Sequence, residues 1–161
     1  MTTNLHRLAL LLAGATTFSP PLLAAEAELI VTAPYVRMVP PGTPTSGAFM
    51  TIRNTGNTDR KLLKADSPAA KTVELHTHIN DNGMMKMRPV KEIEVKAHGQ
   101  AELKPGSHHI MLIDLKRTLK EGETVPLTLT FDDGSTRKID APIKRPQAML
   151  QMEHDHGAIK H

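Results

Sequence analysis

The chain contains no cysteine and no tryptophan among its 161 residues. Without cysteine it has no disulfide framework, so a hydrophobic core has to stabilise the fold unaided. A blue-copper electron-transfer centre requires a thiolate ligand and is excluded for the same reason. Any metal site in this protein therefore has to use imidazole, carboxylate or thioether donors.

Aromatic residues are scarce as well, with one tyrosine and three phenylalanines in the whole chain. Beyond residue 25 only Tyr35, Phe49 and Phe131 remain. Proteins that bind single-stranded nucleic acid stack its bases on aromatic rings, and small-molecule pockets are commonly lined by such rings. We therefore expect neither a nucleic-acid platform nor a large aromatic ligand pocket.

Neither a strong charge imbalance nor a long apolar run is present. The formal net charge is +3, from 20 basic and 17 acidic residues, and the charges are spread along the chain. This distribution gives no polybasic patch for nucleic acid or a membrane surface. No segment approaches the roughly 20 apolar residues of a membrane-spanning helix, so we expect no stable membrane insertion.

The N-terminal segment has the composition of a secretory signal peptide. Its start carries Arg7 and no acidic residue, residues 8–15 are apolar, and small residues follow. Cleavage is expected after Ala25, with Ala27 as the alternative. We assign residues 1–25 to the signal peptide and predict an exported, periplasmic protein.

The rest of the chain is typical of short strands separated by turns, and no segment shows a 3.6-residue apolar period. This pattern predicts an all-β antiparallel sandwich or barrel forming a single domain over residues 26–143. The final segment, 144–161, is expected to be a flexible His/Met-rich tail. The expected strands are Glu28–Ala33, Gly47–Arg53, Lys61–Ala65, Thr72–Ile79, Val90–Val95, Ala101–Leu103, His109–Leu115, Thr124–Phe131 and Thr136–Ile139.

Four residues form the main candidate for a metal site, namely His76, Met87, His109 and Met111. Their spacing is His, ten residues, Met, twenty-one residues, then His-x-Met. Two imidazoles and two thioethers suit a soft or borderline ion, and Cu(I) in particular. Because side chains two apart on a strand share a face, His109 and Met111 are expected to project together.

The alternative is that some of these side chains simply pack. Met111 lies in an apolar run, where a methionine usually fills the core. His78 and Met85 are auxiliary candidates, because His78 shares a strand face with His76 and Met85 shares one with Met87. Outside the initiator, only two methionines lie away from histidines, and this clustering favours a metal site over incidental packing.

The tail contains a second, weaker set of donors: Met149, Met152, His154 and His156. Imidazoles accept Cu(II) and zinc as well as Cu(I), so the tail is a candidate for auxiliary copper binding, including Cu(II). The alternative is a polar end without a ligand.

The sequence resembles the PCu(A)C family of periplasmic copper chaperones over roughly residues 27–143. The four-donor spacing is the family's distinguishing feature, and members often have a Met shortly after the first histidine, where this chain has Thr77 and His78. The segments that carry the resemblance are Val73-Glu-Leu-His76, Gly83-Met-Met-Lys-Met-Arg-Pro-Val90, Leu103-Lys-Pro-Gly106 and His108-His-Ile-Met-Leu112.

The resemblance implies a cupredoxin-like Greek-key sandwich that holds Cu(I) through His76, Met87, His109 and Met111. It also implies delivery of copper to the copper-site subunit of cytochrome c oxidase, often alongside a Sco-type thiol protein. Some relatives carry a His/Met-rich extension resembling the tail here, with a second site that accepts Cu(II).

We therefore predict a metallochaperone and no enzymatic activity, since hydrolytic zinc sites use His and carboxylate ligands with an open position. Two alternatives remain: a copper uptake or resistance carrier with another client, and a structural sandwich module with incidental His and Met. A monomer is expected, and a dimer bridged by metal through the tail remains open.

Overall fold

The structure is a computed structural model that describes residues 28–146, and within this range every regular element is a β-strand. The predicted signal segment and the tail candidates Met149, Met152, His154 and His156 lie outside the described residues. No helix long and apolar enough to span a membrane occurs between residues 28 and 146. The strands are β1 (Leu29–Arg37), β2 (Thr45–Asn54), β3 (Arg60–Asp66), β4 (Ala70–Asp81), β5 (Met84–Pro89), β6 (Ile93–Val95), β7 (Gln100–Leu103), β8 (His109–Leu115), β9 (Thr124–Phe131) and β10 (Thr136–Lys144).

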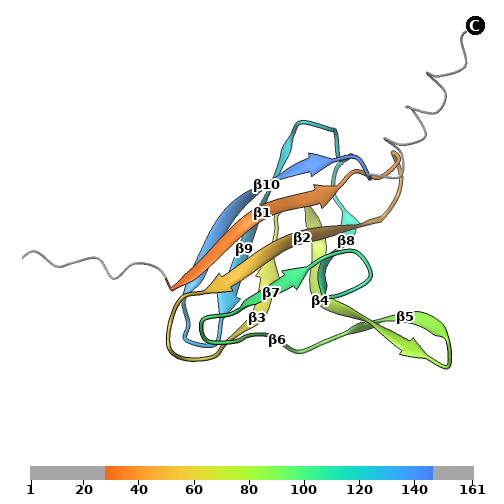
Figure 1. Ribbon diagram of the computed structural model, residues 1–161. Helices are drawn as coiled ribbons and strands as arrows, with labels where there is room; N and C mark the ends of the chain where they lie inside the picture. Colours follow the sequence, from red (N-terminus) through yellow and green to blue (C-terminus); the bar gives the residue numbers. More distant parts are fainter. Residues whose placement is uncertain (1–27, 147–161) are drawn as a thin grey trace, which may run out of the picture.

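The ten strands form one folded sheet in the order β5-β4-β8-β2-β1-β10-β9-β3-β6, and β7 adds to β2. All pairs are antiparallel except β1–β10, which is parallel and joins the two layers of the sandwich. Connections such as β2–β3 and β3–β4 cross between the layers, as in a Greek key (Figure 1). The predicted all-β sandwich is confirmed, with the parallel pair as a departure from a purely antiparallel sheet.

The core lies between the layers and is made by the alternate, inward-facing residues of each strand. On β8, Ile110 and Leu112 are fully buried, whereas Met111 and Ile113 are only partly buried. On β9, Val125, Leu127, Leu129 and Phe131 alternate in the same way. Because burial of each such side chain contributes about 1.5–3 kcal/mol, this core can stabilise the fold without disulfides.

Four strands differ clearly from the expectation, and one of them, β5, was not predicted as a strand. β1 was expected to stop at Ala33, yet it continues to Arg37 through a β-bulge, where Ala33 adopts a φ of 48° and the register shifts. β10 was expected to end at Ile139, but it reaches Lys144 because Ala141 and Ile143 are buried in the core. The strand expected over Val90–Val95 is confined to β6, since the chain leaves β4 after Pro89 and crosses to β3.

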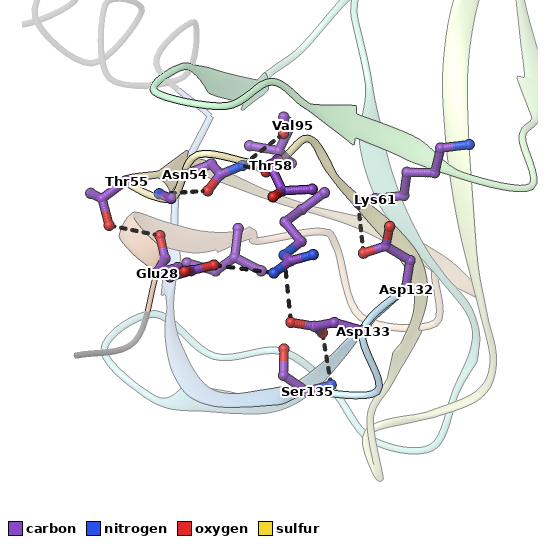
Figure 2. Close-up of polar contacts among 12 residues, drawn as sticks. Glu28, Asn54, Thr55, Thr58, Lys61, Val95, Asp132, Asp133 and Ser135 are labelled. Carbon is purple, nitrogen blue, oxygen red and sulfur yellow. Dashed lines mark hydrogen bonds and ion pairs between the residues drawn. The ribbon is translucent and has the colours of Figure 1, made fainter. Parts of the chain in front are cut away.

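One buried polar side chain organises the loop that follows β2. Asn54 is 1 % exposed. Its Nδ2 donates to the carbonyl oxygens of Thr58 (2.8 Å) and Val95 (3.1 Å), and its Oδ1 accepts from the N–H of Gly56 at 3.0 Å (Figure 2). The amide therefore replaces the backbone pairing that the turn itself lacks, and ties β2 to β6.

We expect Asn54→Ala to lower the free energy of unfolding by about 3 kcal/mol, because it leaves a buried N–H and two carbonyl groups without partners. Chemical denaturation followed by circular dichroism measures this loss. Thr55→Ala is the matched control, since the neighbouring hydroxyl makes one exposed bond to the Glu28 carbonyl. Equal losses in the two variants would contradict an anchoring role for Asn54.

Candidate metal centre

The strand register places the predicted histidines opposite each other. β4 and β8 are antiparallel neighbours in which His76 faces His109 and Glu74 faces Met111. Directly opposed residues project from the same face of a sheet, with Cβ atoms about 4.5–5.5 Å apart. His76, His109 and Met111 therefore share one face of the β4–β8 pair.

That face is the outer surface of the sheet, away from the core. The core side of β8 is formed by Ile110 and Leu112, both 0 % exposed, whereas Met111 between them is partly exposed. On β4, the core side contains Leu75, which opposes Ile110. Met111 is thus not the core filler that its apolar run also allowed.

The fourth predicted donor joins this face from the edge strand. β5 pairs with β4 so that Met87 lies opposite His78, and Met85 opposite Asn80. His78 is two residues from His76 and projects from the same face. Met87 is 47 % exposed and therefore reachable from solvent. Three adjacent strands thus bring all four predicted donors to one face.

The imidazole rings are close enough to share an ion. The ring centre of His109 lies 5.9 Å from that of His76 and 5.1 Å from that of His78. With metal–nitrogen distances of about 2 Å, two imidazoles on one ion have ring centres about 5 Å apart at a tetrahedral angle and about 6 Å apart as the angle opens. Both pairs fall in this range.

Hydrogen bonds fix which nitrogen of each histidine is available. His109 Nδ1 lies 2.9 Å from the Ser107 carbonyl oxygen, which can only accept, so the neutral ring carries its proton on Nδ1 and its lone pair on Nε2. His76 Nε2 lies 2.8 Å from Glu74 Oε2, while its buried Nδ1 has no hydrogen-bond partner among the described residues. A carboxylate or carbonyl behind the ring is the usual support of a metal-binding histidine.

An interruption in the sheet orients His109. β7 and β8 follow one another along the same edge of β2, with Leu103 opposite Met50 and Ile110 opposite Ala48. The turn between them, residues 104–108, is closed by a hydrogen bond from the Lys104 N–H to the His108 carbonyl oxygen (2.9 Å). This turn presents the Ser107 carbonyl to His109 at the start of β8.

Sequence reasoning missed the surroundings of His109. Phe49 is 2 % exposed, yet it packs on the outer face, with its ring centre 6.1 Å from His109 and 5.1 Å from Tyr35. Gly47 allows this packing, because a Cβ there would lie 2.9 Å from the Phe49 ring. The guanidinium of Arg37 lies 5.5 Å from the Phe49 ring centre. A cavity of about 170 Å³ opens beside this cluster, lined by Arg37, Phe49, His78, Met87, Pro105, Gly106 and His109.

Burial lowers the pKa of His109 below its usual 6.5, and the nearby His78, His76 and Arg37 lower it further, against the opposing effect of the Ser107 hydrogen bond. The unfolded chain therefore binds a proton at this position more readily than the folded chain does. A neutral imidazole is also the form that binds a metal, so the lowered pKa reduces competition from protons.

Linkage then fixes the pH dependence of stability. The contribution of His109 to the free energy of unfolding of the metal-free protein should be fully present above about pH 6.5 and lost as the pH falls through the lower pKa of the folded state. Denaturation curves at several pH values measure it. His109→Gln should show a shallower loss of stability on acidification, and the same slope in both proteins would contradict the prediction.

Within residues 28–146, no three His, Cys, Asp or Glu side chains are grouped closely enough to hold a metal ion among themselves. The outer face, however, combines imidazoles with thioethers. Met87 and Met111 supply two such sulfurs on the face that holds His76 and His109.

Comparison with known proteins gives one family and two sequence relatives. The family described as "Putative lipoprotein LpqE-like" matches residues 29–143. The chain is 36 % identical over 104 residues to putative lipoprotein Lxx21020 of Leifsonia xyli, covering 64 % of this chain and only 63 % of that relative. It is 32 % identical over 133 residues to the uncharacterized protein RP573 of Rickettsia prowazekii, covering 80 % and 74 % of the two chains.

Solved structures share the fold. The copper-bound PCuAC domain of PmoF2 matches with a TM-score of 0.64 at 19 % identity, covering 74 % of this chain and 95 % of that one. The solution structure of Cu(I)-bound DR1885 from Deinococcus radiodurans matches with a TM-score of 0.55 at 36 % identity, covering 70 % and 75 %. The cupredoxin-like sandwich that the sequence resemblance implied is therefore confirmed.

Proposed function

Since this chain belongs to the LpqE-like family of putative lipoproteins, we propose that it is a copper chaperone that binds Cu(I) as its cargo. The observation that carries the proposal is the register of β4 and β8, which sets His76 opposite His109 on the outer face with Met111 beside them. The Cu(I)-bound form of DR1885, 36 % identical to this chain, supports the choice of ion.

We assign the ligands to His76, Met87, His109 and Met111. Thioether sulfur prefers soft ions, so two methionines select Cu(I) over harder cations. The four donors are neutral, and the bound ion keeps its single charge without a buried counter-ion. Unlike thiols, these donors are not lost to disulfide formation in an oxidising compartment.

The position of the site favours transfer over storage. Met87 is nearly half exposed, and its strand β5 is the edge of the sheet. A partner's ligands can therefore approach the ion while the buried His109 still holds it. We propose that the protein is exported to the periplasm and delivers copper to the copper centres of cytochrome c oxidase.

The test is an anaerobic Cu(I) competition titration followed by transfer to a soluble copper-site domain of the oxidase. We expect one tightly bound Cu(I) at the outer face, lost in His109→Gln and retained in His98→Gln, whose exposed ring lies in a distant turn. Wild-type affinity no better than that of His109→Gln would refute the binding proposal. Tight binding without transfer would refute the client alone.

A further inference from the structure

Beyond the four assigned ligands, the same face of the sheet carries further imidazole and thioether donors. We propose that His78 and Met85 continue them along the β4–β5 hairpin as an outer donor ladder, along which the Cu(I) cargo enters and leaves. This inference rests on the proposed function and adds the route to the site. In Figure 1 the hairpin extends away from the body of the sandwich, so a ladder on it points toward an approaching partner.

The register of the hairpin puts the ladder on the face of the site. His78 opposes Met87, and Asn80 opposes Met85. His76, His78 and Asn80 alternate along β4, so their partners on β5 share the face that holds His109 and Met111. Met84 opposes Asp81 and projects from the other face. Met84 and Met85 are therefore adjacent and similarly exposed, but only Met85 projects from the face that holds the site.

Exposure rises step by step along the ladder. His109 is 3 % exposed, Met87 47 % and Met85 58 %. Residues two apart on a strand lie about 7 Å apart, which is close enough for neighbouring donors to contact one ion in turn. The cationic Lys86 and Arg88 alternate with the methionines and face the other side, so they do not interrupt the ladder.

His78 links the inner ligands to the outer methionines. Its ring centre is nearer to His109 than that of His76 is, at 5.1 Å against 5.9 Å. Its Nδ1 lies 3.4 Å from the Ser107 carbonyl oxygen, which leaves the lone pair on Nε2. His78, Met87 and His109 also line the same cavity of about 170 Å³. An ion held by His109 can therefore exchange His76 for His78 while it keeps another ligand.

Each step of the route replaces one neutral donor by another, so no electron or proton is transferred. The ion passes from the four assigned ligands to His78, Met87 and His109, then to Met87 and Met85, and finally to Met85 and the acceptor. Because at least one donor is shared between successive steps, free Cu(I) is never released, and the barrier to transfer falls.

The experiment separates rate from affinity in the full-length protein. Cu(I)-loaded wild type, Met85→Leu, Met84→Leu and His78→Gln are mixed anaerobically with bathocuproine disulfonate, and the coloured complex is followed by stopped flow. We expect His78→Gln and Met85→Leu to slow removal about tenfold, equal to a barrier about 1.4 kcal/mol higher. Met84→Leu should transfer at the wild-type rate, and all four affinities should agree within about twofold.

Equal rates for Met85→Leu and Met84→Leu would overturn the ladder. A large loss of equilibrium affinity in His78→Gln would also overturn it, because His78 would then be a primary ligand. Failure of the wild type to bind Cu(I) would instead refute the proposed function, so the two failures are distinguishable.

Discussion

The double variant Met87→Leu, Met111→Leu is expected to bind Cu(I) about a thousandfold more weakly than the wild type while unfolding at the same temperature without copper. Leucine has nearly the volume of methionine, and such exchanges usually cost less than about 1.5 kcal/mol even in a core. Neither methionine belongs to the core: Met87 is 47 % exposed, and Met111 projects from the outer face. The substitution therefore removes the sulfur donors and little else.

The size of the loss follows from the donors that remain. We expect His76 and His109 alone still to bind an ion, but to lose the preference for Cu(I) without the thioethers. Substitutions that only disturb a ligand's support already cost about 10–100-fold in metal affinity, so removal of two ligands should cost more. Anaerobic competition with a Cu(I) chelator measures the affinity.

The matched control changes the same number of methionines elsewhere. Met50→Leu, Met84→Leu replaces one core residue and one exposed residue that faces away from the site. It should keep the wild-type affinity for Cu(I). If both double variants bind equally well, the thioethers of Met87 and Met111 are not ligands.

The sequence predicted most of the strands because local alternation and turn residues determine them. The bounds of β8 and β9 agree with the prediction, and the alternation on β4 correctly separated Leu75 from His76. The bulge in β1 was missed because a proline normally ends a strand, whereas pairing with β2 here continues beyond Pro34. Residues 140–142 of β10 extend its hairpin pairing with β9, and its last two residues pair with the distant β1, which local patterns do not contain.

The candidate site was likewise predictable where local alternation determines it and not where long-range packing does. Strand alternation was enough to place His109 and Met111 on one face, and the structure then set His76 opposite His109. The position of Phe49 beside His109 was not predictable, because it depends on the register of β8 against β2 and on the space left at Gly47. The Ser107 carbonyl that orients His109 comes from a turn, where sequence patterns specify the bend but not the direction of one carbonyl.

Cu(I) should also raise the melting temperature of the wild type by about 10 °C or more. A ligand that binds only the folded chain stabilises it by about 4 kcal/mol at a thousand times its dissociation constant. For a domain of this size, each kcal/mol raises the melting temperature by several degrees. Anaerobic thermal unfolding with and without one equivalent of Cu(I) measures the shift.

This measurement distinguishes the sheet from the tail as the copper site. The four assigned ligands come from β4, β5 and β8 and meet only when the sheet has formed, so copper held there stabilises the fold. Met149, Met152, His154 and His156 are close together in sequence, so copper held by them alone binds folded and unfolded chains alike and gives no shift. His109→Gln should abolish the shift, whereas His154→Gln, His156→Gln should retain it. Stoichiometric Cu(I) binding without any shift would locate the copper in the tail and refute the site on the outer face.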